Sequence, residues 1–217
     1  NVGAASEARV VTVRNEGNAP LAISSIGLGG ADASQFVQGT DCAASLASGG
    51  NCAITVTFKP TTAGDKTAVV SIASNASAAP VTVSLSGRGA APVVLFGAAS
   101  LAFGSVTVGA TSDVKTMSLR NSGDALLTIN SLTLAGVDSN QYTQSNDCGT
   151  SLSPAASCVI SVTFKPTSPG DKTASVNLSS NAGAEPVSFT LTGKGTAPVV
   201  ALSSASVAFG SLPVGQT

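Results

Sequence analysis

Short runs of alternating apolar and polar residues fill this chain, and turn-forming residues separate them at short intervals. Ile54, Val56 and Phe58 alternate with small or polar residues, which is the period-two pattern of a strand with one buried face. Pro60 then ends the run, because proline has no N–H to donate to a ladder. No segment shows a convincing helical period, so the pattern predicts an all-β chain.

The whole pattern occurs twice. Cys148 follows Cys42 by 106 residues, and Cys158 follows Cys52 by the same distance without a gap. The same shift aligns residues 15–17 with 121–123, 64–67 with 170–173, and 87–89 with 193–195. Repeats of this length are whole domains in tandem. We therefore expect a first domain at residues 1–91 that lacks its own first strand, a complete second domain at 92–197, and a strand of a following repeat or a donor strand at 198–217.

The second copy predicts the strands of one domain. Apolar alternation marks residues 100–108, 115–121, 127–134, 158–164, 173–178 and 186–191, with a short segment that starts at 142. The phase of the third run slips between Ile129 and Leu132, which indicates a bulge. About seven short strands in roughly a hundred residues predict an antiparallel β-sandwich of the immunoglobulin type.

Each copy carries two cysteines at the ends of a polar loop, namely Cys42 with Cys52 and Cys148 with Cys158. One interpretation is a metal site, but a closed zinc site needs four cysteine or histidine ligands, and the chain has no histidine. The other is a disulfide in each domain, which would close a short loop and stabilise it by roughly 3 kcal/mol. We expect two disulfides, no metal, and an oxidising compartment.

Composition argues against several classes of function. Histidine-dependent catalysis is excluded, and no Ser-x-x-Lys or Gly-x-Ser-x-Gly pattern offers an activated nucleophile. The repeated acidic residues are Asp32, Asp41, Asp65, Asp138, Asp147 and Asp171. We expect them to form turns through their own backbone, with calcium binding as the alternative. A net charge of −1 and the lack of a ~20-residue apolar run predict no nucleic-acid partner and no membrane insertion. We predict no enzymatic activity and no cofactor.

Several motifs in one order carry a family resemblance. They are Leu101-Ala-Phe-Gly-Ser-Val-Thr-Val-Gly109, Leu119-Arg-Asn-Ser-Gly123, Asp147-Cys148, Cys158, and Val162-Thr-Phe-Lys-Pro166. The chain resembles the bacterial choice-of-anchor D repeat and the wider ASPM–SPD-2–Hydin class, which is similar to major sperm protein. The resemblance implies an immunoglobulin-like sandwich in exported, often surface-anchored multidomain proteins, with no enzymatic activity.

The C-terminal residues repeat the first strand of the second domain. Val207, Phe209, Leu212 and Val214 are the candidate donor-strand residues, and Arg88 and Lys194, each between glycines, mark expected hinges. Either the chain is an excerpt of a longer array, or this strand completes a neighbouring molecule by β-strand addition. We predict a structural repeat module of an extracellular bacterial surface rod or fibre, partnered by further copies in cis or head to tail in trans. The alternative is an adhesin that binds a glycan or protein through its loops.

Overall fold

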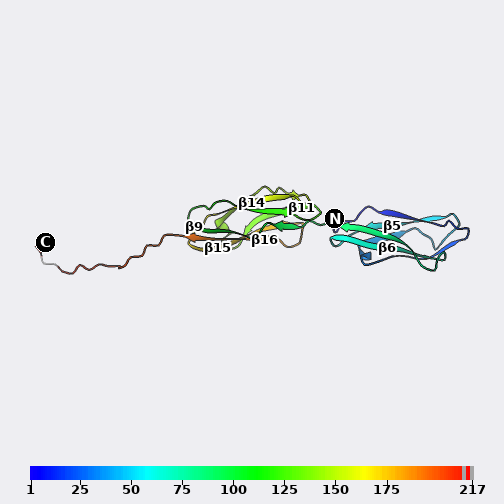
Figure 1. Ribbon diagram of the computed structural model, residues 1–217, viewed down its shortest axis with the longest axis horizontal. Coiled ribbons are helices and arrows are strands. Elements are labelled where there is room, and N and C mark those ends of the chain that lie inside the picture. Colours follow the sequence, from blue (N-terminus) through cyan, green and yellow to red (C-terminus); the bar gives the residue numbers. More distant parts are fainter. Residues whose placement is uncertain (212–213, 216–217) are drawn as a thin grey trace.

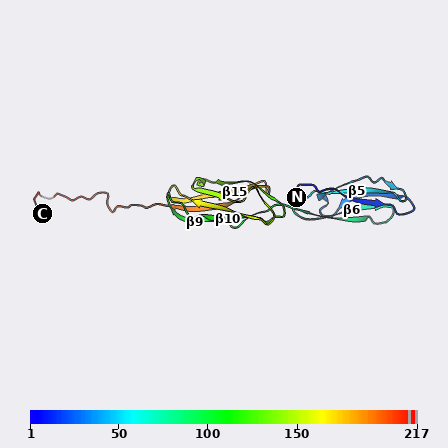
Figure 2. The same ribbon diagram turned by 90° about the horizontal axis from the view of Figure 1, so that it is seen from above.

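Two β-sandwiches lie end to end along one axis, and the C-terminal segment extends beyond the second of them (Figures 1 and 2). This computed structural model describes residues 1–211 and 214–215. We call strands β1–β7 the first sandwich and strands β8–β16 the second sandwich. The all-β architecture confirms the predicted fold class. Among the described residues, no helix has the length and apolar character needed to cross a bilayer.

The first sandwich has two sheets that meet face to face. Its elements are β1 (Arg9–Arg14), β2 (Leu21–Gly29), a 3-10 helix η1 (Ala33–Gln35), β3 (Phe36–Thr40), β4 (Ser45–Leu46), β5 (Asn51–Phe58), β6 (Gly64–Ser74) and β7 (Val81–Gly89). One sheet has the order β1-β5-β3 and the other β4-β2-β6-β7. Within the described chain, β1 and β7 are therefore edge strands with one hydrogen-bonded neighbour each.

The second sandwich repeats this arrangement and adds a strand to each sheet. Its elements are β8 (Val94–Phe96), β9 (Ser100–Thr107), β10 (Lys115–Asn121), β11 (Leu127–Ala135), a 3-10 helix η2 (Ser139–Gln141), β12 (Tyr142–Asn146), β13 (Ser151–Leu152), β14 (Ser157–Phe164), β15 (Gly170–Ser180) and β16 (Val187–Thr196). The sheets have the orders β12-β14-β10-β8 and β13-β11-β15-β16-β9.

One strand pair departs from the expected antiparallel arrangement. Strand β9 runs parallel to β16, with Leu101 beside Leu191 and Val106 beside Gly195. The reason is that the chain leaves β8 in one sheet and crosses to the other sheet before it forms β9. The predicted bulge is confirmed, because the register between β11 and β15 shifts between Ile129 and Ser131.

The two cores differ in size although the sequences correspond residue by residue. Sixteen buried hydrophobic residues form the core of the second sandwich, and six form that of the first. Met117 and Leu119 of β10 are buried, whereas Val11 and Val13 at the corresponding places in β1 are only half-buried. The difference arises where β8 and β9 cover the second core, because the first sandwich has no corresponding strands within the described residues.

Candidate functional site

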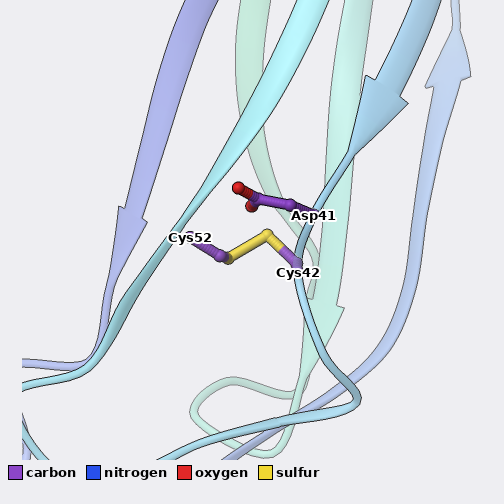
Figure 3. A group of neighbouring side chains, drawn as sticks. All are labelled: Asp41, Cys42 and Cys52. Atoms are coloured by element: carbon purple, nitrogen blue, oxygen red, sulfur yellow. A yellow bond between two sulfur atoms is a disulfide. The ribbon is translucent and has the colours of Figure 1, made fainter.

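The two cysteine pairs are structural staples. Cys42 bonds to Cys52 and Cys148 bonds to Cys158, each with sulfurs about 2.0 Å apart, at the start of β5 and β14. The Asp41 carboxylate lies beside its cystine (Figure 3) and accepts a 2.6 Å hydrogen bond from the Ala53 N–H. Sulfurs bonded to one another are not thiolate ligands, so these acid–cysteine clusters hold a loop against a strand and do not form a metal centre.

Two other repeated acidic residues, Asp32 and Asp138, also stabilise the fold, but not in the way that the sequence predicts. Turn formation through their own backbone was expected. Instead, Asp32 precedes η1 and accepts a 2.9 Å hydrogen bond from the Thr67 N–H of β6. Asp138 does the same for Thr173 in the second sandwich. Each carboxylate therefore ties a helical turn to a strand 35 residues further along the chain.

Arg88 of β7 bridges the two sandwiches. Its Nε donates to Asp124 Oδ2 at 2.8 Å, and its Nη1 donates to Asp65 Oδ1 at 3.0 Å. Asp65 lies in β6, whereas Asp124 lies in the turn that follows β10 of the second sandwich. The linker between the sandwiches comprises residues 90–93, between β7 and β8. Its Ala91 N–H donates to the second carboxylate oxygen of Asp124 at 2.9 Å. The residue that was expected to mark a hinge is therefore part of a clamp.

The electrostatics of this clamp follow from its hydrogen bonds. The bonds from Ala91 and then from Arg88 lower the pKa of Asp124 below the usual range of a carboxyl group. The bonds to Asp124 and then to Asp65 raise the pKa of Arg88. All three side chains are substantially exposed, so solvent screens their attraction, and the main contribution of the clamp is to orientation.

Asn121 binds the linker from inside the second sandwich. We call the region where the linker and β7 contact the turn after β10 the junction. Asn121 is fully buried, and its amide donates to the carbonyl oxygens of Ala125 and Leu152 at 2.8 and 3.0 Å. Its side-chain oxygen accepts the N–H groups of Gly123 and of Val93 in the linker, at 3.1 and 3.2 Å. The linker backbone is thereby fixed to the buried end of β10.

Gly123 lets the linker approach this turn closely. A Cβ at Gly123 would lie 2.5 Å from the Val93 nitrogen and would also overlap the Ala91 carbonyl oxygen. That oxygen accepts the Asp124 N–H at 3.1 Å, and the Ser122 N–H donates to the Val93 carbonyl oxygen at 2.8 Å. The junction is therefore a set of backbone contacts that admits no side chain at position 123.

The first sandwich carries an open apolar groove beside β7. A pocket of about 260 Å³ there is lined by Ser6, Arg9, Val11, Phe36, Val56, Phe58, Ser84, Leu85 and Ser86. In the second sandwich Phe103 of β9 lies at the corresponding place, with its ring centroid 5.7 Å from Tyr142 and 5.9 Å from Phe164. Phe36 and Phe58, the counterparts of those two rings, lie 4.9 Å apart. The groove therefore corresponds in position to the site that Phe103 of β9 fills in the second sandwich.

The residues of the predicted donor strand lie far from this groove in the same chain. Val207 and Phe209 are 70% and 87% exposed, and Val214 is exposed as well. They belong to the segment that extends from the far end of the second sandwich (Figure 1). Leu212 lies outside the described residues.

Sequence reasoning located the turns but missed the roles of Asn121 and Asp124. The composition of residues 121–124 predicts a turn and aligns Asn121 with Asn15, but it assigns no contact to the amide, although each Asn opens an Asn-x-Gly turn at the end of a strand. That pattern is the signal that could have found them, because an amide at a strand end can satisfy both the turn and the neighbouring chain. Asp124 has no acidic counterpart, since Asn18 stands in its place in the first copy.

Fold and junction together define a tandem of immunoglobulin-like sandwiches joined by a fixed linker. Family models match both parts of the chain: residues 2–88 match the HYDIN/CFA65/VesB-like Ig-like domain, and residues 91–196 match Cep192 domain 4. The predicted resemblance to the ASPM–SPD-2–Hydin class of immunoglobulin-like domains is therefore confirmed for each of the two matched parts of the chain.

Several solved structures are similar to the chain. A protein of unknown function from Porphyromonas gingivalis W83 shares 17% identity over 87% of this chain and 91% of its own, with a TM-score of 0.42. The PapD-like domain 7 of human CEP192 shares 20% over 49% and 87%, with a TM-score of 0.37. The S-layer protein rSbsC(31-844) shares 12% over 79% and 22%, with a TM-score of 0.37. No curated protein matches the chain.

Proposed function

We propose that this chain is a structural module of an extracellular bacterial surface rod or fibre, in which copies join head to tail through the C-terminal segment. The observation that carries the proposal is the junction, where Arg88 of the first sandwich binds Asp124 of the second and Asn121 of the second sandwich accepts the Val93 N–H of the linker. Sandwiches joined by both a side-chain clamp and a fixed linker keep one orientation, and a rod needs a fixed orientation between its units. The two disulfides fit an oxidising compartment outside the cytosol.

The junction also carries a cleft, and its lining supports a structural role over ligand binding. The cleft has a volume of about 650 Å³ and is lined mostly by small apolar residues and backbone. Its amide Asn181 is already committed, since it donates to the Leu126 carbonyl oxygen and accepts the Thr128 N–H. A sugar site needs several free polar groups, and few are left here.

Imaging and solution scattering of the purified chain test the proposal. We expect fibres with a regular axial repeat, and at low concentration an elongated particle. Arg88→Ala should widen the distribution of interdomain angles seen in scattering, whereas Lys115→Ala, which alters an exposed basic residue of β10 away from the junction, should leave the profile unchanged. A particle that stays monomeric at every concentration, or a compact globule, would contradict the proposal. Capture of a glycan or protein ligand would favour the adhesin instead.

A further inference from the structure

The two edge strands of the first sandwich correspond to paired strands in the second. In the second sandwich β8 pairs antiparallel with β10, which places Phe96 beside Leu119, and β9 pairs parallel with β16. In the first sandwich the counterparts of β10 and β16 are β1 and β7, and both are edges of their sheets. Unpaired strand edges present backbone donors and acceptors that an added strand can satisfy.

The exposed C-terminal segment has the sequence of those added strands. Under the 106-residue shift, Val94-Leu-Phe96 corresponds to Val200-Ala-Leu202, and Ser100-Leu-Ala-Phe-Gly-Ser105 corresponds to Ser206-Val-Ala-Phe-Gly-Ser211. Val200, Leu202 and Phe209 are all largely exposed where they stand. One segment therefore repeats both a β8-like and a β9-like strand.

We propose that residues 199–211 of a second copy bind the first sandwich and donate one strand to each of its sheets. Residues 200–202 would pair antiparallel with β1, with Leu202 beside Val13, and residues 206–211 would pair parallel with β7, with Val207 beside Leu85. Phe209 would enter the pocket and pack against Phe36 and Phe58, as Phe103 packs against Tyr142 and Phe164. The proposal deepens the head-to-tail assembly proposed above and rests on it for its biological setting.

The pocket has the chemistry that Phe209 requires. Phe58 is only half-buried in the first sandwich, whereas its counterpart Phe164 is fully buried beneath Phe103. The alternation of β9 places Phe103 inward and Ala102 outward. The corresponding residues Phe209 and Ala208 would therefore face the core and the solvent respectively.

The turn at the outer end of the first sandwich is also ready to receive the incoming chain. Asn15 repeats three hydrogen bonds of Asn121, to Ala19, Leu46 and Gly17. The fourth hydrogen bond of Asn121 comes from the Val93 N–H of the linker. In the proposed complex, the Val199 N–H of the second copy would donate the corresponding hydrogen bond to Asn15. A Cβ at Gly123 would clash with the linker backbone. At Gly17 the same space is free of backbone, and a Cβ there would meet only the Asn15 side-chain oxygen at 3.3 Å.

The direction of β7 requires the segment to come from another molecule. β7 runs toward the junction, because Gly89 leads into the linker, so a parallel partner enters the groove from the opposite end of the first sandwich. From Thr196, residues 197–205 of the same chain span at most roughly 32 Å. To reach the outer end of the first sandwich, the segment would have to run back along both sandwiches. One sandwich alone contains strands of nine or ten residues, about 30 Å long, so the segment is too short.

Cysteine trapping tests the register directly with the full chain. Ser84 corresponds to Thr190, which pairs with Ser100, and Ser100 corresponds to Ser206. We therefore expect oxidation of a mixture of Ser84→Cys and Ser206→Cys chains to give a disulfide-linked heterodimer. A mixture of Ser84→Cys with Ser211→Cys is the control, because Ser211 would lie several residues further along β7 and should not cross-link. Equal cross-linking in both mixtures, or none in either, would overturn the proposed register.

Substitutions outside the folded cores test the same contacts. Phe209→Asp, made in the Ser206→Cys chain, should abolish the cross-link, and its matched control Ala208→Asp should retain it. Gly17→Ala in the acceptor should also abolish the cross-link while leaving its thermal unfolding unchanged, because its Cβ would block the incoming backbone. Asn18→Asp should increase cross-linking, since it would supply Lys194 of the second copy with the carboxylate that Asp124 supplies to Arg88.

The outcomes separate this inference from the proposed function. Fibres that persist with Phe209→Asp would overturn strand donation but leave a rod joined in another way. A trapped heterodimer without fibres in the wild-type chain would support the groove and its occupant and refute the fibre. Loss of the cross-link with both Phe209→Asp and Ala208→Asp would refute insertion of Phe209 into the pocket.

Discussion

Replacing Asn121 by alanine should destabilise the second sandwich more than any other single polar substitution at the junction. The side chain is fully buried and makes four hydrogen bonds, to Ala125, Leu152, Gly123 and Val93. Alanine would leave two carbonyl oxygens and two N–H groups without this partner. Water has little access to replace it, because Asn121 has no exposed surface.

The size of the effect follows from the number of bonds. Each intramolecular hydrogen bond contributes about 0.5–1.5 kcal/mol net, so four correspond to roughly 2–6 kcal/mol of the free energy of unfolding. Asn15→Ala in the first sandwich removes three bonds. It should therefore cost about 1 kcal/mol less than Asn121→Ala, by the same contribution for each bond.

Urea unfolding can be followed separately in the second sandwich. The chain has one tyrosine and no tryptophan, and Tyr142 is buried in the second core, so tyrosine fluorescence reports on that sandwich. With a slope of about 2 kcal/mol/M, Asn121→Ala should lower the fluorescence midpoint by roughly 1–3 M urea. Asn15→Ala should leave that midpoint nearly unchanged and lower a transition seen by circular dichroism. An unchanged fluorescence midpoint in Asn121→Ala would refute the reasoning.

Three further predictions concern the staple, the aromatic core and the clamp. Replacing both Cys148 and Cys158 by serine should lower the stability of the second sandwich by roughly 3 kcal/mol, measured by the same fluorescence in urea. Burial, and then the charge of Asp138, raise the pKa of Tyr142 to about 12. The stability of the second sandwich should therefore be intact below about pH 10, the usual pKa of tyrosine, and fall above it. Tyr142→Phe should remove that fall at a cost of about 1 kcal/mol for the lost hydrogen bond to Lys172. Because the pKa of Asp124 is lowered, the clamp should persist at neutral pH, begin to weaken below about pH 4 and be lost as the pH falls through that lowered pKa. Asp124→Asn should reproduce at neutral pH the broader interdomain angles that scattering detects in acid, and identical profiles at both pH values for the wild-type chain would contradict this.

Much of the fold could be predicted from the sequence because the determining signals are local. Alternation in residues such as Ile160, Val162 and Phe164 places one face of a strand in the core, and all three side chains are fully buried. The cysteine spacing likewise depends only on a short loop and its strand. A phase slip near Ile129 was enough to indicate the bulge.

The junction and the parallel strand could not be predicted, because they depend on contacts between distant segments. Arg88 and Asp124 are 36 residues apart and belong to different sandwiches. The pairing of β9 with β16 depends on where the chain crosses between sheets, and no periodicity reports that crossing. Asn121 has ordinary turn chemistry in the sequence, and its burial becomes visible only when the linker packs over it.

In the proposed rod, the strands that follow the linker would both carry mechanical load and complete the fold of a unit. In the second sandwich β9 begins near the junction and β16 ends at the far side, and the two are parallel neighbours. Tension along the long axis would pull β9 from its start and β16 from its end, so it would load their hydrogen bonds together in shear. Peeling would instead break them one at a time. Because Phe103 of β9 also completes the core, a sandwich can yield along this axis only by giving up buried apolar contacts. In the proposed rod, β9 would therefore serve both as a mechanical link between units and as part of the core that stabilises one of them.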